Sequence, residues 1–285
     1  MLTGIIPFGF FEYALINSGS TLLRVDSLVA SDTGFEKWVH GKKYDSLIFQ
    51  KAYWLQMMQL FRGPKILDLC DPDWFQYDVD IMETGNSVHA ITCSSRELTD
   101  LVKSYFPGKI VEHVPDRLDL KTFPSPRKVH RGKAEKAVWF GYIHNAYETL
   151  PQMLPAIREA GLQLRIISHL PYSEKDGILE LNPEFIYYEQ SKVNGQIREA
   201  DILLNPRSNR AFFRYKSNNK SLIGWQLGLP VAVTGEDVMR LMSPDERNHE
   251  VSVMRPVVEQ EYGIEKTAEQ YRDILCRIGE RYFSN

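Results

Sequence analysis

Short apolar segments alternate with longer segments of helical periodicity along most of this chain. The apolar segments have the length and the flanking residues of buried strands, and they lie at 2–6, 46–50, 65–69, 90–92, 110–113, 137–140, 163–168, 186–188, 202–205 and 230–234. Helical periodicity is clearest at 95–105, 150–160 and 217–227. Because parallel neighbours in a sheet need a crossover connection, usually a helix, this alternation predicts an α/β fold with parallel sheets.

The domain organisation follows from one interruption of this pattern. With 285 residues, 43% of them hydrophobic, the chain can bury the core of one large domain or of two moderate ones. Residues 119–136 contain two prolines and several bases but few apolar residues, so we expect a linker or an exposed excursion there. The sequence therefore predicts two domains, at 1–122 and 123–285.

The last segment of the chain has the periodicity of an amphipathic helix. Its apolar positions are Ile264, Ala268, Tyr271, Ile274, Leu275, Ile278 and Tyr282. An apolar stripe of this kind normally docks on a hydrophobic core. We therefore expect a terminal helix, for which the first domain is a candidate docking surface.

Charge and cysteine content restrict the class of protein and its partners. A formal net charge of -3 gives no general attraction to nucleic acid or to an anionic membrane, so an anionic ligand must meet a local group of bases. Cys70, Cys93 and Cys276 lack the spacing of a zinc site or a disulfide framework and indicate buried thiols in a reducing compartment. No run of about 18 apolar residues occurs. We expect a cytoplasmic protein without a transmembrane segment that does not bind nucleic acid, and peripheral membrane contact stays open.

Two lysines flank a group of short polar residues where a predicted helix begins. Residues 216–220 read KSNNK, and the helix after them is expected to end at Gly228, two residues before Pro230. Ser217 or Asn218 can cap this helix, and the backbone N–H groups and the dipole at its start favour an anion.

Several bases gather around that helix start, where they oppose the helix dipole. They are Arg207, Arg210, Arg214, Lys216 and Lys220. Their placement is explained if a polyanion such as a diphosphate binds among them. A solvated basic loop with ordinary caps is the alternative interpretation.

Three segments together resemble a known family of enzymes. NPRSNRAFFRYKSNNKSLIGWQLGLPVAVTG (205–235) resembles the donor-binding region of GT-B glycosyltransferases, especially the large retaining family numbered four. KAVWFGYIHNAYETLPQMLPAI (136–157) resembles the start of that family's donor domain, and ITCSSRELTDLVKSYFPGKIVEHVPDRLD (91–119) resembles the end of its first domain, with Ser94 and Ser95 as helix caps. The resemblance implies two Rossmann-like domains and metal-independent transfer of a sugar from a nucleotide-diphosphate sugar to a glycan, a lipid-linked acceptor or another hydroxyl, as in polysaccharide biosynthesis.

The resemblance also implies roles for particular residues. Lys216 and Lys220 would be the catalytic cations that neutralise the diphosphate, and Asp71 would orient the acceptor hydroxyl or act as its base. The donor would be bound by Gly141, His144, Asn145, Arg207, Arg214, Ser217, Asn218 and Asn219. Ser18 and Gly19, in a loop at 17–24, would lie near the phosphates and the acceptor. Neither a metal nor a cofactor is expected.

The chain departs from the family at one pair of positions. These enzymes usually carry two glutamates eight positions apart, which hold the ribose of the donor. The corresponding positions here are Tyr215 and Ile223, so the ribose contacts and the donor are open. A catalytically silent GT-B-like module that binds a nucleotide or a glycan is therefore an alternative, and a sugar-nucleotide epimerase or hydrolase on the same scaffold is another.

A group of aspartates supports a further alternative. It consists of Asp68, Asp71, Asp73, Asp78 and Asp80. Two Asp-x-Asp triplets occur in it, the spacing with which GT-A glycosyltransferases hold a divalent metal on a nucleotide diphosphate. A metal-dependent GT-A enzyme using Asp71 and Asp73 is thus conceivable, although a turn with a helix cap explains the same residues. His89 is a rival of Asp71 as the base, but a lone histidine beside a strand is more often structural.

Other signatures of α/β enzymes are missing from the sequence. No G-x-G-x-x-G follows a predicted strand, and neither H-E-x-x-H nor G-x-S-x-G occurs. Gly4 and Gly9 have the spacing of a P-loop, but Phe10 stands where the lysine should be. The sequence therefore gives no support to a dinucleotide dehydrogenase, a P-loop NTPase, a zinc protease or an α/β-hydrolase.

Overall fold

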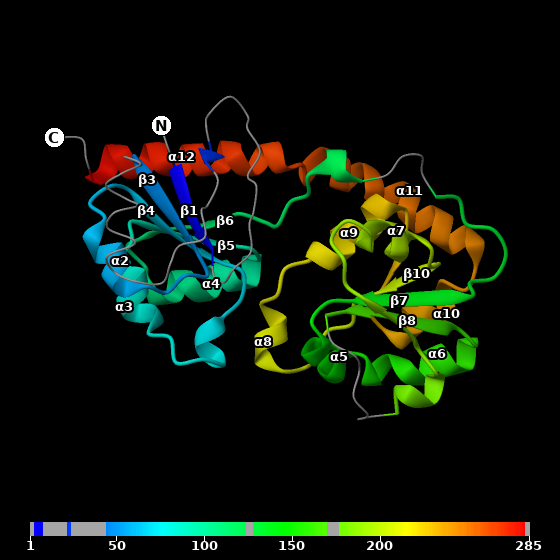
Figure 1. Ribbon diagram of the computed structural model, residues 1–285. Coiled ribbons are helices and arrows are strands. Elements are labelled where there is room, and N and C mark those ends of the chain that lie inside the picture. Colours follow the sequence, from blue (N-terminus) through cyan, green and yellow to red (C-terminus); the bar gives the residue numbers. More distant parts are fainter. Residues whose placement is uncertain (1–2, 8–21, 24–43, 124–127, 170–176, 283–285) are drawn as a thin grey trace. The chain divides into compact units, whose positions relative to one another are not determined.

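The computed structural model describes residues 3–7, 22–23, 44–123, 128–169 and 177–282 (Figure 1). The chain forms two compact units. Unit 1 comprises residues 1–116, 215–217 and 265–285, and unit 2 comprises residues 117–214 and 218–264. Ser18 and Gly19 of the expected phosphate loop lie outside the described residues.

Unit 1 is built on a six-stranded parallel sheet. Its strands are β1 (Thr3–Pro7), β2 (Leu22–Leu23), β3 (Ser46–Gln50), β4 (Lys65–Leu69), β5 (Ala90–Cys93) and β6 (Ile110–His113), in the order β2-β1-β3-β4-β5-β6. The bounds of β3, β4 and β6 are those predicted, and β1 and β5 differ from the prediction by one residue.

Helices cover both faces of this sheet. One face packs its apolar side chains against α2 (Leu55–Leu60), α3 (Ile81–Asn86) and α4 (Arg96–Tyr105). The other face presents Ile48, Ile66 and Ala90, which pack on α12 (Ile264–Tyr282), the red helix of Figure 1. The buried residues of α12 are Ile274, Leu275 and Ile278, three of the predicted apolar stripe. Alternation of inward and outward side chains along each strand supplies both faces at once.

Unit 2 is built on a five-stranded parallel sheet. Its strands are β7 (Lys136–Phe140), β8 (Gln163–Ser168), β9 (Glu184–Tyr187), β10 (Ile202–Leu204) and β11 (Val231–Ala232), in the order β11-β10-β7-β8-β9. One face packs on α5 (Ile143–Thr149), α6 (Leu154–Ala160) and α10 (Gly235–Arg240), and the other on α7 (Val193–Arg198) and α9 (Asn219–Leu227). The remaining α-helices described are α8 (Ala211–Arg214) and α11 (Pro244–Glu261). The predicted α/β class with parallel sheets and a C-terminal helix is confirmed.

Three boundaries in unit 2 differ from the prediction for local reasons. The strand expected at 230–234 is shorter because Thr234 caps α10, in a capping box with Asp237. The strand expected at 186–188 begins at Glu184, which pairs with Arg165 of β8. A helix, α5, lies before the helical segment predicted at 150–160 and ends at Thr149, whose hydroxyl donates to the Asn145 carbonyl.

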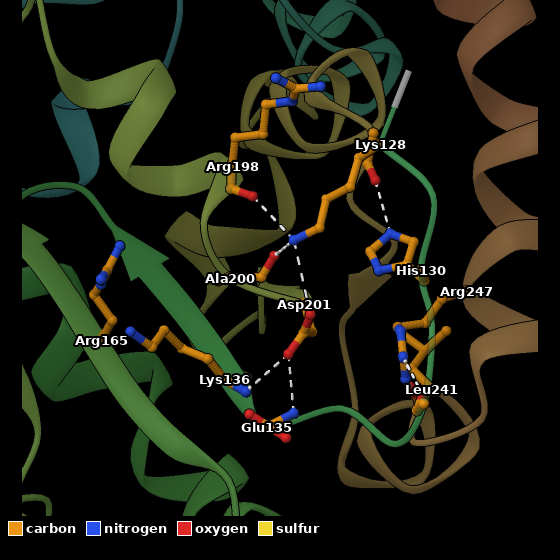
Figure 2. Close-up of polar contacts among 12 residues, drawn as sticks. Lys128, His130, Glu135, Lys136, Arg165, Arg198, Ala200, Asp201, Leu241 and Arg247 are labelled. Carbon is orange, nitrogen blue, oxygen red and sulfur yellow. Dashed lines mark hydrogen bonds and ion pairs between the residues drawn. The ribbon is translucent and has the colours of Figure 1, made fainter. Parts of the chain in front are cut away.

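The segment before β7 is largely exposed, as predicted, at Val129, Arg131, Gly132, Lys133 and Glu135, but it is attached to unit 2 through Lys128 and His130. Figure 2 shows the Lys128 side chain pointing to the carbonyls of Arg198 and Ala200 and to Asp201. The imidazole of His130, which is buried, donates from Nε2 to the Gly228 carbonyl at 2.9 Å. These contacts attach residues 128–136 to unit 2. They could not be predicted from the sequence, because Lys128 and His130 bond to backbone carbonyls that are about 70 and 98 positions away along the chain.

Two further observations bear on the predictions from composition. Within the described ranges, no helix is long and apolar enough to cross a membrane. The cysteines are free thiols, of which Cys93 is buried, Cys70 is half-buried and Cys276 is exposed, so the expectation of three buried thiols is wrong for Cys276.

Candidate functional site

The first turn of α9 lies at the carboxyl edge of the unit 2 sheet. Asn205, directly after β10, donates from Nδ2 to the Ser221 hydroxyl of α9 at 2.8 Å, and both side chains are buried. Ligands of open α/β sheets bind at this edge. Asn205 therefore fixes the start of α9 relative to the strands, a function that the sequence analysis missed although the residue opens the quoted motif.

The expected cap of α9 is wrong in its details. Asn218 occupies the N-cap position, but its side chain does not cap the first turn. The Asn218 carbonyl oxygen Oδ1 instead accepts from Arg207 Nη2 at 2.9 Å, and the Ser217 hydroxyl donates to Asp116. The dipole at the start of the helix favours an anion at this place.

Lys220 lies in this first turn, and its ammonium is close to the loop that follows β7. Its Nζ is 4.2 Å from the centroid of the Trp139 ring and 5.5 Å from that of Phe140. A methyl group built on Gly141 would lie only 2.7 Å from the same Nζ. The structure thus brings Gly141 and Lys220 together, as the family resemblance implied for a donor site.

The Gly141 loop is held firmly in unit 2. Gly141 has a φ of +140°, its N–H donates to the Ile167 carbonyl at 3.1 Å, and its carbonyl accepts from the Ser168 hydroxyl at 2.7 Å. The next helix, α5, begins two residues later and carries His144 and Asn145 in its first turn. Gly141, His144 and Asn145 therefore lie in one continuous loop and helix start.

The arginines upstream of α9 are dispersed rather than gathered on one ligand site. Arg207 contacts Asn218 at the α9 start, as described above. Arg210 forms an ion pair with Glu148 of α5. Arg214 is exposed at the end of α8. Of these three arginines, Arg207 is the one that we place at the start of α9, through its hydrogen bond to Asn218.

Lys216 and Ser217 belong to unit 1, whereas Asn218, Asn219 and Lys220 belong to unit 2. Lys216 Nζ lies 3.7 Å from Asp71 Oδ1, and the carbonyl of Tyr215 accepts from the Ser95 hydroxyl at 2.7 Å. The sequence analysis treated KSNNK as one binding group. The structure gives its two lysines different partners, a carboxylate for Lys216 and aromatic rings for Lys220.

Asp71 is part of a polar cluster at the carboxyl edge of the unit 1 sheet. Lys51, after β3, places its Nζ 2.8 Å from Asp71 Oδ2 and 3.1 Å from Asp73 Oδ1, and the Tyr53 hydroxyl donates to Asp73 at 2.8 Å. Burial alone would lower the pKa of Lys51, but Asp71 and Asp73 outweigh it and raise the pKa. Burial raises the pKa of Asp73, against the influence of Lys51 and Tyr53. Lys51 and Tyr53 could not be identified as site residues from the sequence, because their local sequence pattern has no functional signature.

The remaining aspartates have structural contacts. Asp68 is buried and accepts from Gln50 at 3.2 Å and from the Thr92 hydroxyl at 2.7 Å, and burial raises its pKa. Asp80 caps α3 through the Glu83 N–H at 2.8 Å. Within the described ranges, no group of three or more His, Cys, Asp or Glu side chains could hold a metal ion.

His89 is also tied to the backbone. Its Nδ1 accepts from the Lys65 N–H at 3.1 Å. Burial and then Lys65 and Lys109 lower its pKa to about 4. This contact supports a structural role for His89, in line with the more common function of such histidines.

The two positions of the missing glutamates carry packing side chains. The Tyr215 ring lies edge-on to Phe75, with centroids 5.8 Å apart, and packs against the unit 1 core. Ile223 packs against the apolar side chains around α9. Neither residue offers a carboxylate to a ribose.

No protein-family model and no curated protein sequence matches the chain. Solved structures do match. Sucrose-phosphate synthase from Thermosynechococcus elongatus is 12% identical, with a TM-score of 0.64 over 87% of this chain and 77% of that one. HepE from Anabaena, in complex with UDP and glucose, is 11% identical, with a TM-score of 0.65 over 86% of this chain and 81% of that one. TarM from S. aureus, in a complex that contains UDP, is 9% identical, with a TM-score of 0.63 over 85% of this chain and 58% of that one.

The fold of the chain is therefore the GT-B fold of glycosyltransferases, across about 85% of its length. This confirms the resemblance stated from the KSNNK and Gly141 segments at the level of the fold. Identities of 9–12% carry the architecture and leave the activity to be argued from the residues.

Proposed function

We propose that the protein is a glycosyltransferase that moves a sugar from a nucleotide-diphosphate sugar to a hydroxyl acceptor without a metal ion. The observation that carries the proposal is the position of the Lys220 ammonium. It lies in the first turn of α9 and against the backbone of Gly141, at the carboxyl edge of the unit 2 sheet. A fixed cation and a helix start at one place suit a diphosphate.

The chemistry required of this site is stabilisation of a leaving group. As the bond between the sugar and the diphosphate breaks, negative charge grows on the phosphate oxygens and positive character grows on the anomeric carbon. Lys220 and the N–H groups of the α9 start would take up that negative charge, with Arg207 held nearby by Asn218. Gly141, His144, Asn145 and Asn219 would shape the donor site. Arg214 and Ser217, which have other surroundings in the structure, have less support as donor residues.

Asp71 is the proposed acceptor residue in unit 1. Its carboxylate accepts from Lys51 and lies near Lys216, so both oxygens have a cationic neighbour. In this arrangement Asp71 suits the orientation of an acceptor hydroxyl, and Lys216 acts on Asp71 in addition to any role toward the diphosphate. The acceptor would be a glycan or a lipid-linked sugar, and the reaction would take place in the cytoplasm.

The test is donor turnover under metal-free conditions. Purified protein is incubated in EDTA with UDP-glucose, UDP-N-acetylglucosamine, GDP-mannose and ADP-glucose, each with a mixture of mono- and oligosaccharide acceptors, and the released nucleoside diphosphate is measured. UDP is the first choice because the HepE and TarM structures contain it. The proposal expects release that depends on an acceptor and falls at least tenfold in Lys220→Met. Release that requires magnesium and is indifferent to Lys220→Met would contradict it.

One observation favours a second candidate function. Tyr215 and Ile223 occupy the positions of the family's glutamate pair, so a binding module that has lost turnover is the alternative. It predicts binding of a nucleoside diphosphate, lost in Lys220→Met, without release of nucleotide from any donor. Donor consumption without an acceptor would instead indicate a hydrolase or an epimerase on the same scaffold.

A further inference from the structure

We propose that Trp139 is a positioning residue that holds the Lys220 ammonium against Gly141 through the face of its indole ring. This inference rests on the proposed function, because it assigns Lys220 to the diphosphate of the donor. The family resemblance implies no role for Trp139.

The geometry of the indole supports this role. Trp139 lies on β7, is 1% exposed and is the largest of the fully buried side chains. Lys220 Nζ lies 4.2 Å from its ring centroid, well inside the range of about 6 Å in which a ring attracts a cation, and tryptophan is the strongest of the aromatic partners. The adjacent Phe140 ring is farther away, at 5.5 Å.

Gly141 provides the other side of the same place. A Cβ at this position would lie 2.7 Å from Lys220 Nζ, 3.2 Å from Lys220 Cε and 3.4 Å from the Trp139 ring. Only a residue without a side chain therefore leaves room for the ammonium between the backbone and the indole. The indole face of Trp139 and the absence of a side chain at Gly141, both at the end of β7, together define the position of the Lys220 ammonium.

An aromatic ring suits this task better than a carboxylate does. A carboxylate would hold the lysine but would also cancel its charge, as Asp71 does for Lys216 and Lys51 in unit 1. An indole face attracts the ammonium and adds no negative charge of its own that would compete with a phosphate. Holding a flexible lysine in place before the ligand arrives also reduces the entropy lost on binding.

The experiment is a double-mutant cycle on UDP affinity, measured by calorimetry in EDTA. Lys220→Met is expected to weaken UDP binding about 10- to 100-fold. Trp139→Phe, which keeps an aromatic ring of weaker attraction, is expected to weaken it about three- to tenfold. In the Lys220→Met background, Trp139→Phe should have no further effect, because the ring no longer has an ammonium to hold. A loss of equal size in both backgrounds would mean that Trp139 acts only through packing, and would overturn the proposal.

Two more variants keep the result decisive. Gly141→Ala, which changes the other side of the ammonium, should also lose affinity in the wild-type background, and a smaller loss should persist beside Lys220→Met because the φ of +140° strains any residue with a Cβ. Ile166→Val is the control for packing. It removes one buried methyl group from the same core as Trp139, and it should leave the affinity for UDP unchanged. If Trp139→Phe proves unfolded by circular dichroism, the same cycle with 5-fluorotryptophan in place of tryptophan, which keeps the size of the ring and weakens its attraction for a cation, decides the question.

The outcomes separate this inference from the function on which it rests. Affinity that is lost in Lys220→Met but kept in both Trp139→Phe and Gly141→Ala overturns the positioning role and leaves the proposed function standing. If the wild-type protein binds none of UDP, GDP and ADP, the proposed function fails and the role of Trp139 fails with it.

Discussion

Lys51 shows how a single residue can organise a site from an unfavourable backbone conformation. Its φ of 48° lies in the left-handed region, which costs a residue with a Cβ about 1 kcal/mol or more. In return its ammonium meets both Asp71 and Asp73, and the Asp73 side chain is only 7% exposed. Strain of this kind persists where the surrounding contacts fix the residue.

We predict that Lys51→Met destabilises unit 1 by about 1–3 kcal/mol, because it leaves Asp73 without its cation and Asp71 with Lys216 alone. Unfolding in urea at pH 7.5 measures the effect. Lys192→Met is the matched control, since it removes a lysine from an ion pair with Glu189 whose members are 64% and 50% exposed. A surface pair of this kind contributes about 0–1 kcal/mol. Equal losses in the two variants would contradict the assigned role of Lys51.

His130 makes the stability of unit 2 sensitive to acid. Burial, together with Lys128 and Arg247, lowers its pKa to about 4, although the bond to the Gly228 carbonyl acts in the opposite direction. Its Nδ1 is buried, and no partner for it lies within the described residues. Between the ordinary histidine pKa of 6.5 and about 4, the unfolded chain binds a proton that the folded chain does not. Stability must therefore fall as the pH falls through this interval, by at most about 3 kcal/mol.

The variant His130→Gln tests this dependence. Glutamine can still donate to the Gly228 carbonyl but does not titrate, so we expect a shallower fall of the urea midpoint between pH 7 and pH 4.5. His89, whose pKa is lowered to about 4 in unit 1, retains part of the slope in this variant. His249→Gln, at an exposed position of α11, is the control. An unchanged slope in His130→Gln would contradict the account.

At the scale of the element, the end of α9 depends on a glycine for two reasons. Gly228 has a φ of +82°, and a Cβ on it would lie 3.0 Å from Lys128 Cβ and 3.1 Å from the Lys128 nitrogen. Its N–H and carbonyl both take part in contacts, the carbonyl with His130. The turn therefore joins the helix to the segment before β7.

We expect Gly228→Ala to destabilise unit 2 by about 1–3 kcal/mol, through the unfavourable φ and the contact with Lys128. Gly195→Ala is the opposite case, because Gly195 lies inside α7 and a Cβ there would have no neighbour within 4 Å. Alanine should stabilise that helix by about 0.5–1 kcal/mol. Thermal unfolding of both variants measures the contrast, and a Gly228→Ala variant as stable as the wild type would refute this explanation of the turn.

The elements of this protein could be predicted well from the sequence where burial governs them. The bounds of β3, β4, β6 and β8 coincide with the predicted segments, because each strand has at least one buried apolar side chain in its interior. The prediction failed where a polar contact decides the end, as at Thr234. It failed for the same reason at the start of α9, where the Ser217 hydroxyl donates to Asp116 and the side chain of the N-cap residue Asn218 accepts from Arg207.

The candidate site could be predicted only in part. The Gly141 loop and Lys220 carry a local pattern of strand, glycine and helix that the family resemblance exposes. Lys51 and Tyr53 carry none, because their meaning comes from aspartates about twenty positions away along the chain. Likewise, the separation of Lys216 from Lys220 is visible only once the long-range contacts of residues 215–217 are known.

At the scale of the whole molecule, the fold persists where sequence identity has almost vanished. Identities of 9–12% accompany TM-scores of 0.63–0.65 in the three structures compared above. Parallel sheets tolerate this divergence because any apolar side chain of suitable volume fills a strand position. The candidate donor site tolerates less sequence divergence than the sheets do, because it depends on particular charged residues such as Lys220. The function must therefore be tested at these residues.

The most direct test of the account is UDP binding by calorimetry in EDTA, with wild-type protein and Lys220→Met side by side and Lys192→Met as the control. The account predicts binding without metal, a loss of at least tenfold in Lys220→Met and no change in the control. Binding that appears only with magnesium and is equal in all three proteins would contradict the claim that a diphosphate meets Lys220 at the start of α9.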